Sequence, residues 1–122
     1  MNNYEPFIIF CDSIKNPVTN PVVSNGLDIG VLSDISIEVK NAESINIVVE
    51  GCGCTVDSED KILSDAECVW TPLACLSASN FIMSQIITSN GIFFVNVGGC
   101  NRLRIRVTNI SGQATITGMG VR

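Results

Sequence analysis

The amino-acid sequence predicts an all-β protein: one antiparallel β-sandwich of the jelly-roll or immunoglobulin-like kind, with about seven to nine strands and an extended amino-terminal arm. Three observations predict this class. The chain has 122 residues, 46% of them hydrophobic, which suffices for one core. Apolar and polar residues alternate with a period of two in several segments. Gly, Asn and Ser recur between these segments, and helix-favouring runs are nearly absent.

The clearest strand covers residues 102–108. Three apolar residues there alternate with three arginines: Leu103, Ile105 and Val107 with Arg102, Arg104 and Arg106. This alternation predicts one face in the core and one face of guanidinium groups. The guanidinium face either stays solvated or meets acidic side chains of an adjacent strand or of a partner subunit.

Polar residues divide further alternating runs. Residues 41–44 separate the runs 35–40 and 45–49, and we predict that they form a hairpin loop that pairs these two runs. Residues 109–112 are likewise predicted to be the turn of a carboxyl-terminal hairpin that leads into a strand at 113–119.

Other expected strands cover residues 4–11, 80–88 and 91–97. Residues 16–26 contain two prolines and predict an extended linker. The chain then divides into residues 1–25, an amino-terminal strand or arm with its linker, and a sandwich domain of residues 26–122. Residues 57–67 have some helical character, enough for one turn in a loop.

The amino-terminal segment allows two interpretations. Its apolar residues Phe7, Ile8, Ile9 and Phe10 suit strand addition to another copy, and they equally suit an ordinary first strand of the same sandwich. The candidates for subunit contacts are therefore these four residues together with Arg102, Arg104 and Arg106.

Six cysteines are a high and even number for this length, and all are candidates for disulfides: Cys11, Cys52, Cys54, Cys68, Cys75 and Cys100. Cys52 and Cys54 point to one face of a strand and need separate partners, whereas the pairing as a whole stays open. The amino end does not have the pattern of a signal peptide, so we expect synthesis in the cytoplasm. Virion proteins and spore-surface proteins reconcile this origin with later oxidation.

The residue types argue against catalysis. The chain contains no histidine, which removes the usual activators of Ser or Cys nucleophiles. Asp57, Glu59 and Asp60 allow a Ca²⁺ or carboxylate site but favour a solvated acidic loop. The four thiols of Cys52, Cys54, Cys68 and Cys75 allow zinc, yet their spacing favours disulfides or buried thiols. We therefore predict no enzyme, no cofactor and no metal.

Charge and hydropathy bear on partners. The net charge is −5 and the basic residues form no tract, so no nucleic-acid partner is expected. No apolar stretch approaches the roughly 18 residues of a membrane helix, so no membrane partner is expected either. Trp70 is a single large aromatic, and packing in the core or an interface suits it better than a sugar platform.

Four segments together resemble a small β-sandwich module of tailed-phage virion proteins: residues 68–73, 91–99, 103–107 and 111–117. The resemblance is one of strand rhythm and covers roughly residues 34–122. It implies a capsid-decoration, head-fibre or tail-associated role. The chain is more weakly similar to cysteine-bearing jelly-roll subunits of bacterial spore appendages.

The expected function is that of a non-enzymatic structural protein. We expect it to assemble with copies of itself and with other structural proteins of a particle, on a virion or an extracellular surface. A disulfide-supported fibre subunit is one alternative, and a glycan-binding sandwich module is another.

Overall fold

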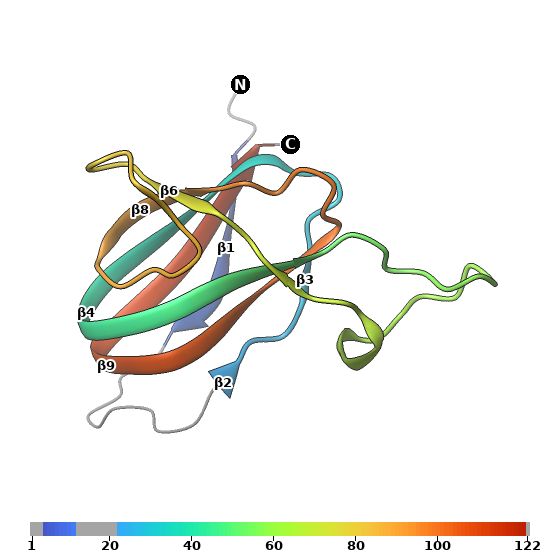
Figure 1. Ribbon diagram of the computed structural model, residues 1–122, viewed down its shortest axis with the longest axis horizontal. Coiled ribbons are helices and arrows are strands. Elements are labelled where there is room, and N and C mark those ends of the chain that lie inside the picture. Colours follow the sequence, from blue (N-terminus) through green and yellow to red (C-terminus); the bar gives the residue numbers. More distant parts are fainter. Residues whose placement is uncertain (1–3, 12–21, 122) are drawn as a thin grey trace.

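The computed structural model describes residues 4–11 and 22–121 of the chain. These residues form a nine-stranded antiparallel sheet in the order β1-β9-β4-β8-β6-β7, with β2 and β3 added to β9 and β5 added to β4 (Figure 1). The strands are β1 Tyr4–Cys11, β2 Val22–Val23, β3 Leu27–Asp28, β4 Ser33–Cys52, β5 Thr71–Pro72, β6 Cys75–Ser77, β7 Met83–Ser84, β8 Gly91–Val95 and β9 Arg102–Val121. The helical element of this described part is a short 3-10 turn, η1, at Asp65–Glu67.

Two strands of 20 residues, β4 and β9, dominate the fold. They pair with each other from Ser33 opposite Val121 to Cys52 opposite Arg102. The two predicted hairpins are therefore wrong. Residues 41–44 and 109–112 do not reverse the chain, because each lies inside one of these continuous strands.

The polar residues of the two strands mark a shared bend. The pairing register shifts on both sides of Ala42, which lies opposite Gly112. Asn41 and Gly112 have positive φ angles of 61° and 87°. Bulges of this kind bend a strand and increase its twist. Figure 1 shows β4 and β9 turning together at one side of the molecule.

The bend folds the sheet onto itself and makes the predicted sandwich. On one side of the bend, β4 pairs with β8 and β9 pairs with β1. On the other side, β4 pairs with β5 and β9 pairs with β2 and β3. Side chains from both halves fill a single core, among them Ile35, Ile37, Val39, Ile47, Val49, Leu103, Ile105, Val107 and Ile116. The predicted all-β sandwich is confirmed, since alternate residues of both long strands point inward.

The smaller elements differ from the expected ones mainly in length. Residues 4–11 form β1, which pairs with β9 of the same chain and has a register shift between Ile8 and Phe10. The expected strand at 80–88 shrinks to β7 at an edge of the sheet. The predicted linker contains β2, which pairs with Val107 and Arg106, whereas residues 16–21 lie outside the described part. No helix within the described ranges has the length and apolar character to cross a bilayer.

Candidate functional site

Residues 53–70 form a long loop that leaves the end of β4, extends away from the sandwich and returns to β5 (Figure 1). Its outer part is a narrow hairpin in which Val56 bridges Ile62. At the tip, the Asp57 carboxylate accepts hydrogen bonds from the backbone N–H groups of Glu59 and Lys61, at 2.8 and 3.0 Å. Asp57 thus stabilises a turn at the tip of the loop, as Asp side chains commonly do.

Arg102 lies buried beneath the base of this loop. Its side chain donates from Nη1 to the Leu63 carbonyl at 2.9 Å and to the Asp65 carboxylate at 3.3 Å. Its Nε donates to Asp28 at 3.1 Å, and Nη1 also donates to the Cys68 sulfur at 3.2 Å. Only 7% of Arg102 is exposed. The guanidinium therefore joins β3, the loop and β9, using the planar fork of donors that lysine lacks.

The surroundings of Arg102 hold it in the charged form. Burial by itself lowers the pKa of the guanidinium. The hydrogen bond to Asp28 and the electrostatic interactions with Cys68, Asp28 and Asp65 outweigh that effect and raise the pKa above its usual value. A charged Arg102 is thus part of the folded state.

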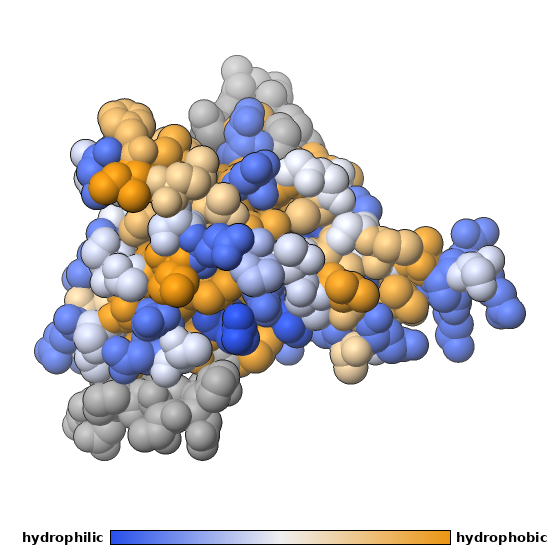
Figure 2. All heavy atoms as spheres, in the orientation of Figure 1, coloured by the Kyte–Doolittle hydropathy of each residue, from blue (hydrophilic) through white to orange (hydrophobic). Residues whose placement is uncertain are grey.

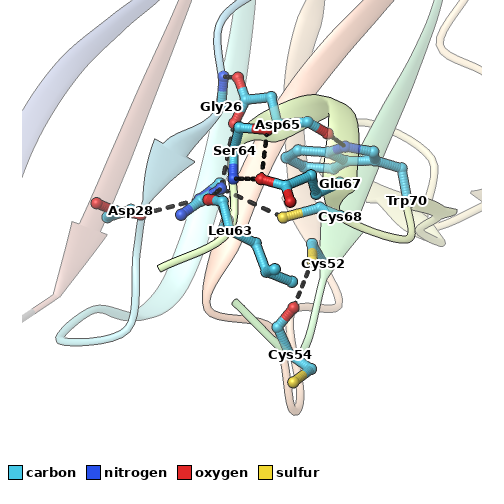
Figure 3. A network of polar contacts seen from close by, with 11 residues as sticks. Gly26, Asp28, Cys52, Cys54, Leu63, Ser64, Asp65, Glu67, Cys68 and Trp70 are labelled. Atoms are coloured by element: carbon cyan, nitrogen blue, oxygen red, sulfur yellow. Dashed lines mark hydrogen bonds and ion pairs between the residues drawn. The ribbon is translucent and has the colours of Figure 1, made fainter. Parts of the chain in front are cut away.

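Asp65 connects this arginine to the rest of the loop base (Figure 3). Its carboxylate accepts a hydrogen bond from the Gly26 backbone N–H at 2.6 Å, and its carbonyl accepts one from Trp70 Nε1 at 2.8 Å. Ser64 and Glu67 form a capping box around the same 3-10 turn. The base of the loop is therefore fixed by several independent hydrogen bonds.

The other two arginines meet an acidic residue of the adjacent strand. Glu50 is only 6% exposed and accepts a hydrogen bond from Arg104 Nε at 2.9 Å. Arg106 Nε lies 3.4 Å from the other Glu50 oxygen. The Arg104 guanidinium also lies over one face of the Trp70 ring, 4.2 Å from the centre of that ring. Of the alternatives left open for this arginine face, the structure shows partners on an adjacent strand.

The five cysteines whose side chains are described are free thiols, and they lie in different environments. Cys54 is exposed and donates to the Val56 carbonyl at 3.1 Å. Cys75 is buried in the core at the start of β6. Cys100 is half-buried in the loop between β8 and β9. Cys52 and Cys68 are brought together: they are 1% and 9% exposed, and they lie next to each other under the loop (Figure 3).

The environments of the buried thiols favour the protonated form. Burial raises the pKa of Cys52 to about 11, and the hydrogen-bonding and charge of the Cys68 sulfur add to this rise. Burial alone raises the pKa of Cys75 to about 11, and it also raises the pKa of Cys100.

The structure brings together only part of the predicted site. Of the four thiols considered for zinc, Cys52 and Cys68 meet, whereas Cys54 and Cys75 lie elsewhere. Within residues 4–11 and 22–121, no group of three or more potential ligands lies close enough to hold a metal ion. Cys11 ends β1 opposite Thr115, and Phe7 to Phe10 lie in that strand, but the side chains of β1 are outside the description.

Three acidic partners of the arginines were not anticipated: Asp28, Glu50 and Asp65. Asp28 is 74 residues from Arg102 in the sequence, so no local pattern connects the two. Glu50 offered a weak signal, because it ends an apolar strand run whose other members are buried. Only the register of β4 against β9, which places Glu50 opposite Arg104, identifies it as a buried partner.

Solved structures that share this fold include two prophage proteins. No family model matches the chain, and no curated protein matches it in sequence. The SPBc2 prophage-derived protein YomS has a TM-score of 0.69 and 14% identity, over 98% of this chain and 93% of that one. The PBSX exported protein XepA has a TM-score of 0.73 and 11% identity, over 98% of this chain and 38% of that one. The chain is thus similar in fold to proteins of prophages, and it spans little more than a third of XepA.

Proposed function

We propose that this protein is a non-enzymatic structural subunit of a phage particle, and that it assembles with further copies of itself through the outer face of its sheet. The likeness in fold to prophage proteins supports the phage association. A role in capsid decoration, a head fibre or a tail on the virion surface is the finer form of the proposal. It comes from the sequence resemblance, with other particle proteins as additional partners.

The observation that carries the proposal is a row of mostly apolar, uncharged residues across the outer face of the sheet. In neighbouring strands, Met83 lies opposite Leu76, Leu76 opposite Phe94, Phe94 opposite Ser36, and Ser36 opposite Met119. Residues directly opposite each other in a sheet project from the same face. These five residues, the outer row, therefore run continuously over β7, β6, β8, β4 and β9.

The outer row exposes enough apolar surface for a subunit contact. Met83, Phe94, Met119 and the neighbouring Ile92 are each between 41% and 55% exposed. At about 200 Å² for a fully exposed large side chain, they present on the order of 350 Å². A standard interface buries about 800 Å² per partner, a little over half of it apolar. Four side chains thus provide most of the apolar part of one such surface.

The surroundings of the row also suit a second copy. No residue of the row is charged, so two such rows do not repel each other even though each chain has a net charge of −5. A hollow of about 440 Å³ beside Phe94, lined in part by Asp34 and Val121, offers space for an apolar side chain of the neighbour. Figure 2 shows further hydrophobic side chains exposed at the hairpin between β6 and β7, where Phe81 lies.

Replacing Phe94 by aspartate tests this proposal. We expect the wild-type protein to form a discrete oligomer in size-exclusion chromatography with light scattering, unchanged by reductant. Phe94→Asp is expected to lower the association constant by about 30-fold or more, because a charge would be buried at the centre of the contact. Ile62→Asp is the matched control, since Ile62 is 75% exposed but lies on the projecting loop. It is expected to assemble like the wild type.

Other outcomes would contradict specific parts of the proposal. A wild-type protein that stays monomeric at its highest soluble concentration would exclude self-assembly through this face. Equal assembly of Phe94→Asp and wild type would place the contact elsewhere. Oligomers that collapse on reduction would instead favour the disulfide-supported fibre, with the exposed Cys54 as the first thiol to substitute.

A further inference from the structure

We propose that Cys52 and Cys68 form a redox pair that closes into a disulfide at the base of the projecting loop when the protein meets a small-molecule disulfide of the glutathione type. The proposal names one bond in a set of six cysteines that allows 15 complete pairings. It is independent of how the protein assembles, and the two are tested separately.

The two sulfur atoms meet because both chain segments are fixed against the same arginine. Cys52 is the last residue of β4 and lies directly opposite Arg102 in the ladder. Cys68 follows the 3-10 turn, and its sulfur accepts the hydrogen bond from Arg102 Nη1 at 3.2 Å. The Cys52 sulfur also lies against the backbone of Val69. The fold thus holds both cysteine-bearing segments against the same arginine, with the two side chains in contact.

The other described thiols lack such a neighbour. Cys54 extends past the end of β4 and hydrogen-bonds to Val56 at the outside of the loop. Cys75 is packed into the hydrophobic core. Cys100 approaches Gly51, in the strand position before Cys52, but its sulfur contacts the side of β4 where Leu73 lies. Of the cysteines with described side chains, Cys52 and Cys68 are therefore the two placed to react with each other.

The environments of the two sulfurs set the order of the reaction. Cys68 is 9% exposed and Cys52 is 1% exposed, so Cys68 is the thiol that the external disulfide reaches first. The Cys68 thiolate attacks the external disulfide, forms a mixed disulfide and releases one thiolate. Cys52 then loses its proton to this leaving thiolate and attacks the Cys68 sulfur, which expels the second thiolate. Two protein thiols are oxidised and one external disulfide is reduced to two thiols.

Closure would fasten the loop at its root. The bond would join residues 52 and 68 across the whole projecting segment, whose present anchors are the hydrogen bonds of Arg102 and Asp65. For a closed loop of about 15 residues, the chain-entropy model gives a stabilisation equivalent to roughly 100-fold in the unfolding equilibrium. This fits a protein that is made in a reducing compartment and later exposed to oxidant.

Peptide mapping without reduction tests the pairing. The reduced protein is incubated with oxidised glutathione, quenched with acid and digested with trypsin and chymotrypsin. Cleavage after Lys61 and after Trp70 gives a peptide in which Cys68 is the only cysteine. We expect this peptide to be linked to the peptide that contains Cys52. The linkage should persist in Cys54→Ser and in Cys75→Ser, and it should be absent from Cys52→Ser.

Two further measurements test the mechanism. In Cys52→Ser, glutathione is expected to remain on Cys68, because the resolving thiol is missing. Oxidation should make unfolding of the wild type roughly 100-fold less favourable in urea and should give no such stabilisation in Cys52→Ser. A linkage of Cys68 to Cys54 or Cys100, a lasting glutathione adduct on the wild type, or no oxidation at all would each overturn the proposal. Circular dichroism of the reduced variants verifies that each is folded.

Discussion

Gly112→Ala is expected to destabilise the protein by about 3 kcal/mol, because the bend in the two long strands depends on this residue. Gly112 has a φ of +87°, which costs an L-residue roughly 1–2 kcal/mol. A Cβ atom there would also lie 2.9 Å from the Glu43 backbone nitrogen and 3.0 Å from the Asn41 carbonyl. Both atoms belong to the opposing bulge and cannot move without opening the bend.

Urea unfolding followed by circular dichroism measures this effect. Gly98→Ala is the matched control, since the nearest atom to its Cβ, on Asn96, is 3.6 Å away. It is expected to change stability by no more than about 0.5 kcal/mol. Gly112→Asn should be less harmful than Gly112→Ala, because asparagine tolerates positive φ better. A loss below about 1 kcal/mol for Gly112→Ala would show that the fold does not depend on this bulge.

Arg102→Met is expected to cost about 3 kcal/mol. The substitution keeps the apolar stem but removes the donors to Leu63, Asp65, Asp28 and Cys68. Removing one partner of a buried ion pair typically costs about 3–5 kcal/mol. The lower end applies here because the side chains of Asp28 and Asp65 are 83% and 39% exposed and can regain water.

Arg106→Met provides the control on the same strand with the same change in charge. Arg106 Nε has no hydrogen-bond partner and lies 3.4 Å from Glu50, so its loss should cost less than about 1 kcal/mol. Fluorescence of Trp70, the only tryptophan, gives a local measurement, because its Nε1 donates to the Asp65 carbonyl. Arg102→Met should alter this emission in the folded state. Equal stability losses in the two variants would show that Arg102 is not the organising residue of the loop base.

The sequence resemblance and the comparison of solved structures lead to the same kind of β fold by different routes. The resemblance used the strand rhythm of residues 68–117, and the shared fold is seen in YomS and XepA at 14% and 11% identity. Strand rhythm can persist at such identity because it records only which residues face the core. The contacts through which a subunit assembles are specific side chains, and the outer row proposed here is open to direct test.

Part of the chemistry of the site was accessible from residue types, and part was not. The sequence contains no histidine and six cysteines, and it predicted that thiols and the arginines of residues 102–106 are the candidate site residues. The contact between Cys52 and Cys68 could not be predicted from the sequence, because the loop between them has no regular period that fixes its path. Likewise, the alternation in residues 102–108 predicted a row of arginines but not the burial of Arg102 beneath a loop from elsewhere.

The sequence by itself determined the strand class and the core. Alternation with a period of two placed Ile35, Ile37, Leu103 and Ile105 inward, and the structure buries all four. The tertiary structure alone decided that residues 41–44 are a bulge rather than a turn. A short polar interruption is compatible with both, and the choice depends on which strand lies alongside. Since β4 pairs with β9, whose own interruption lies opposite, the two bend together and fold one sheet into a sandwich.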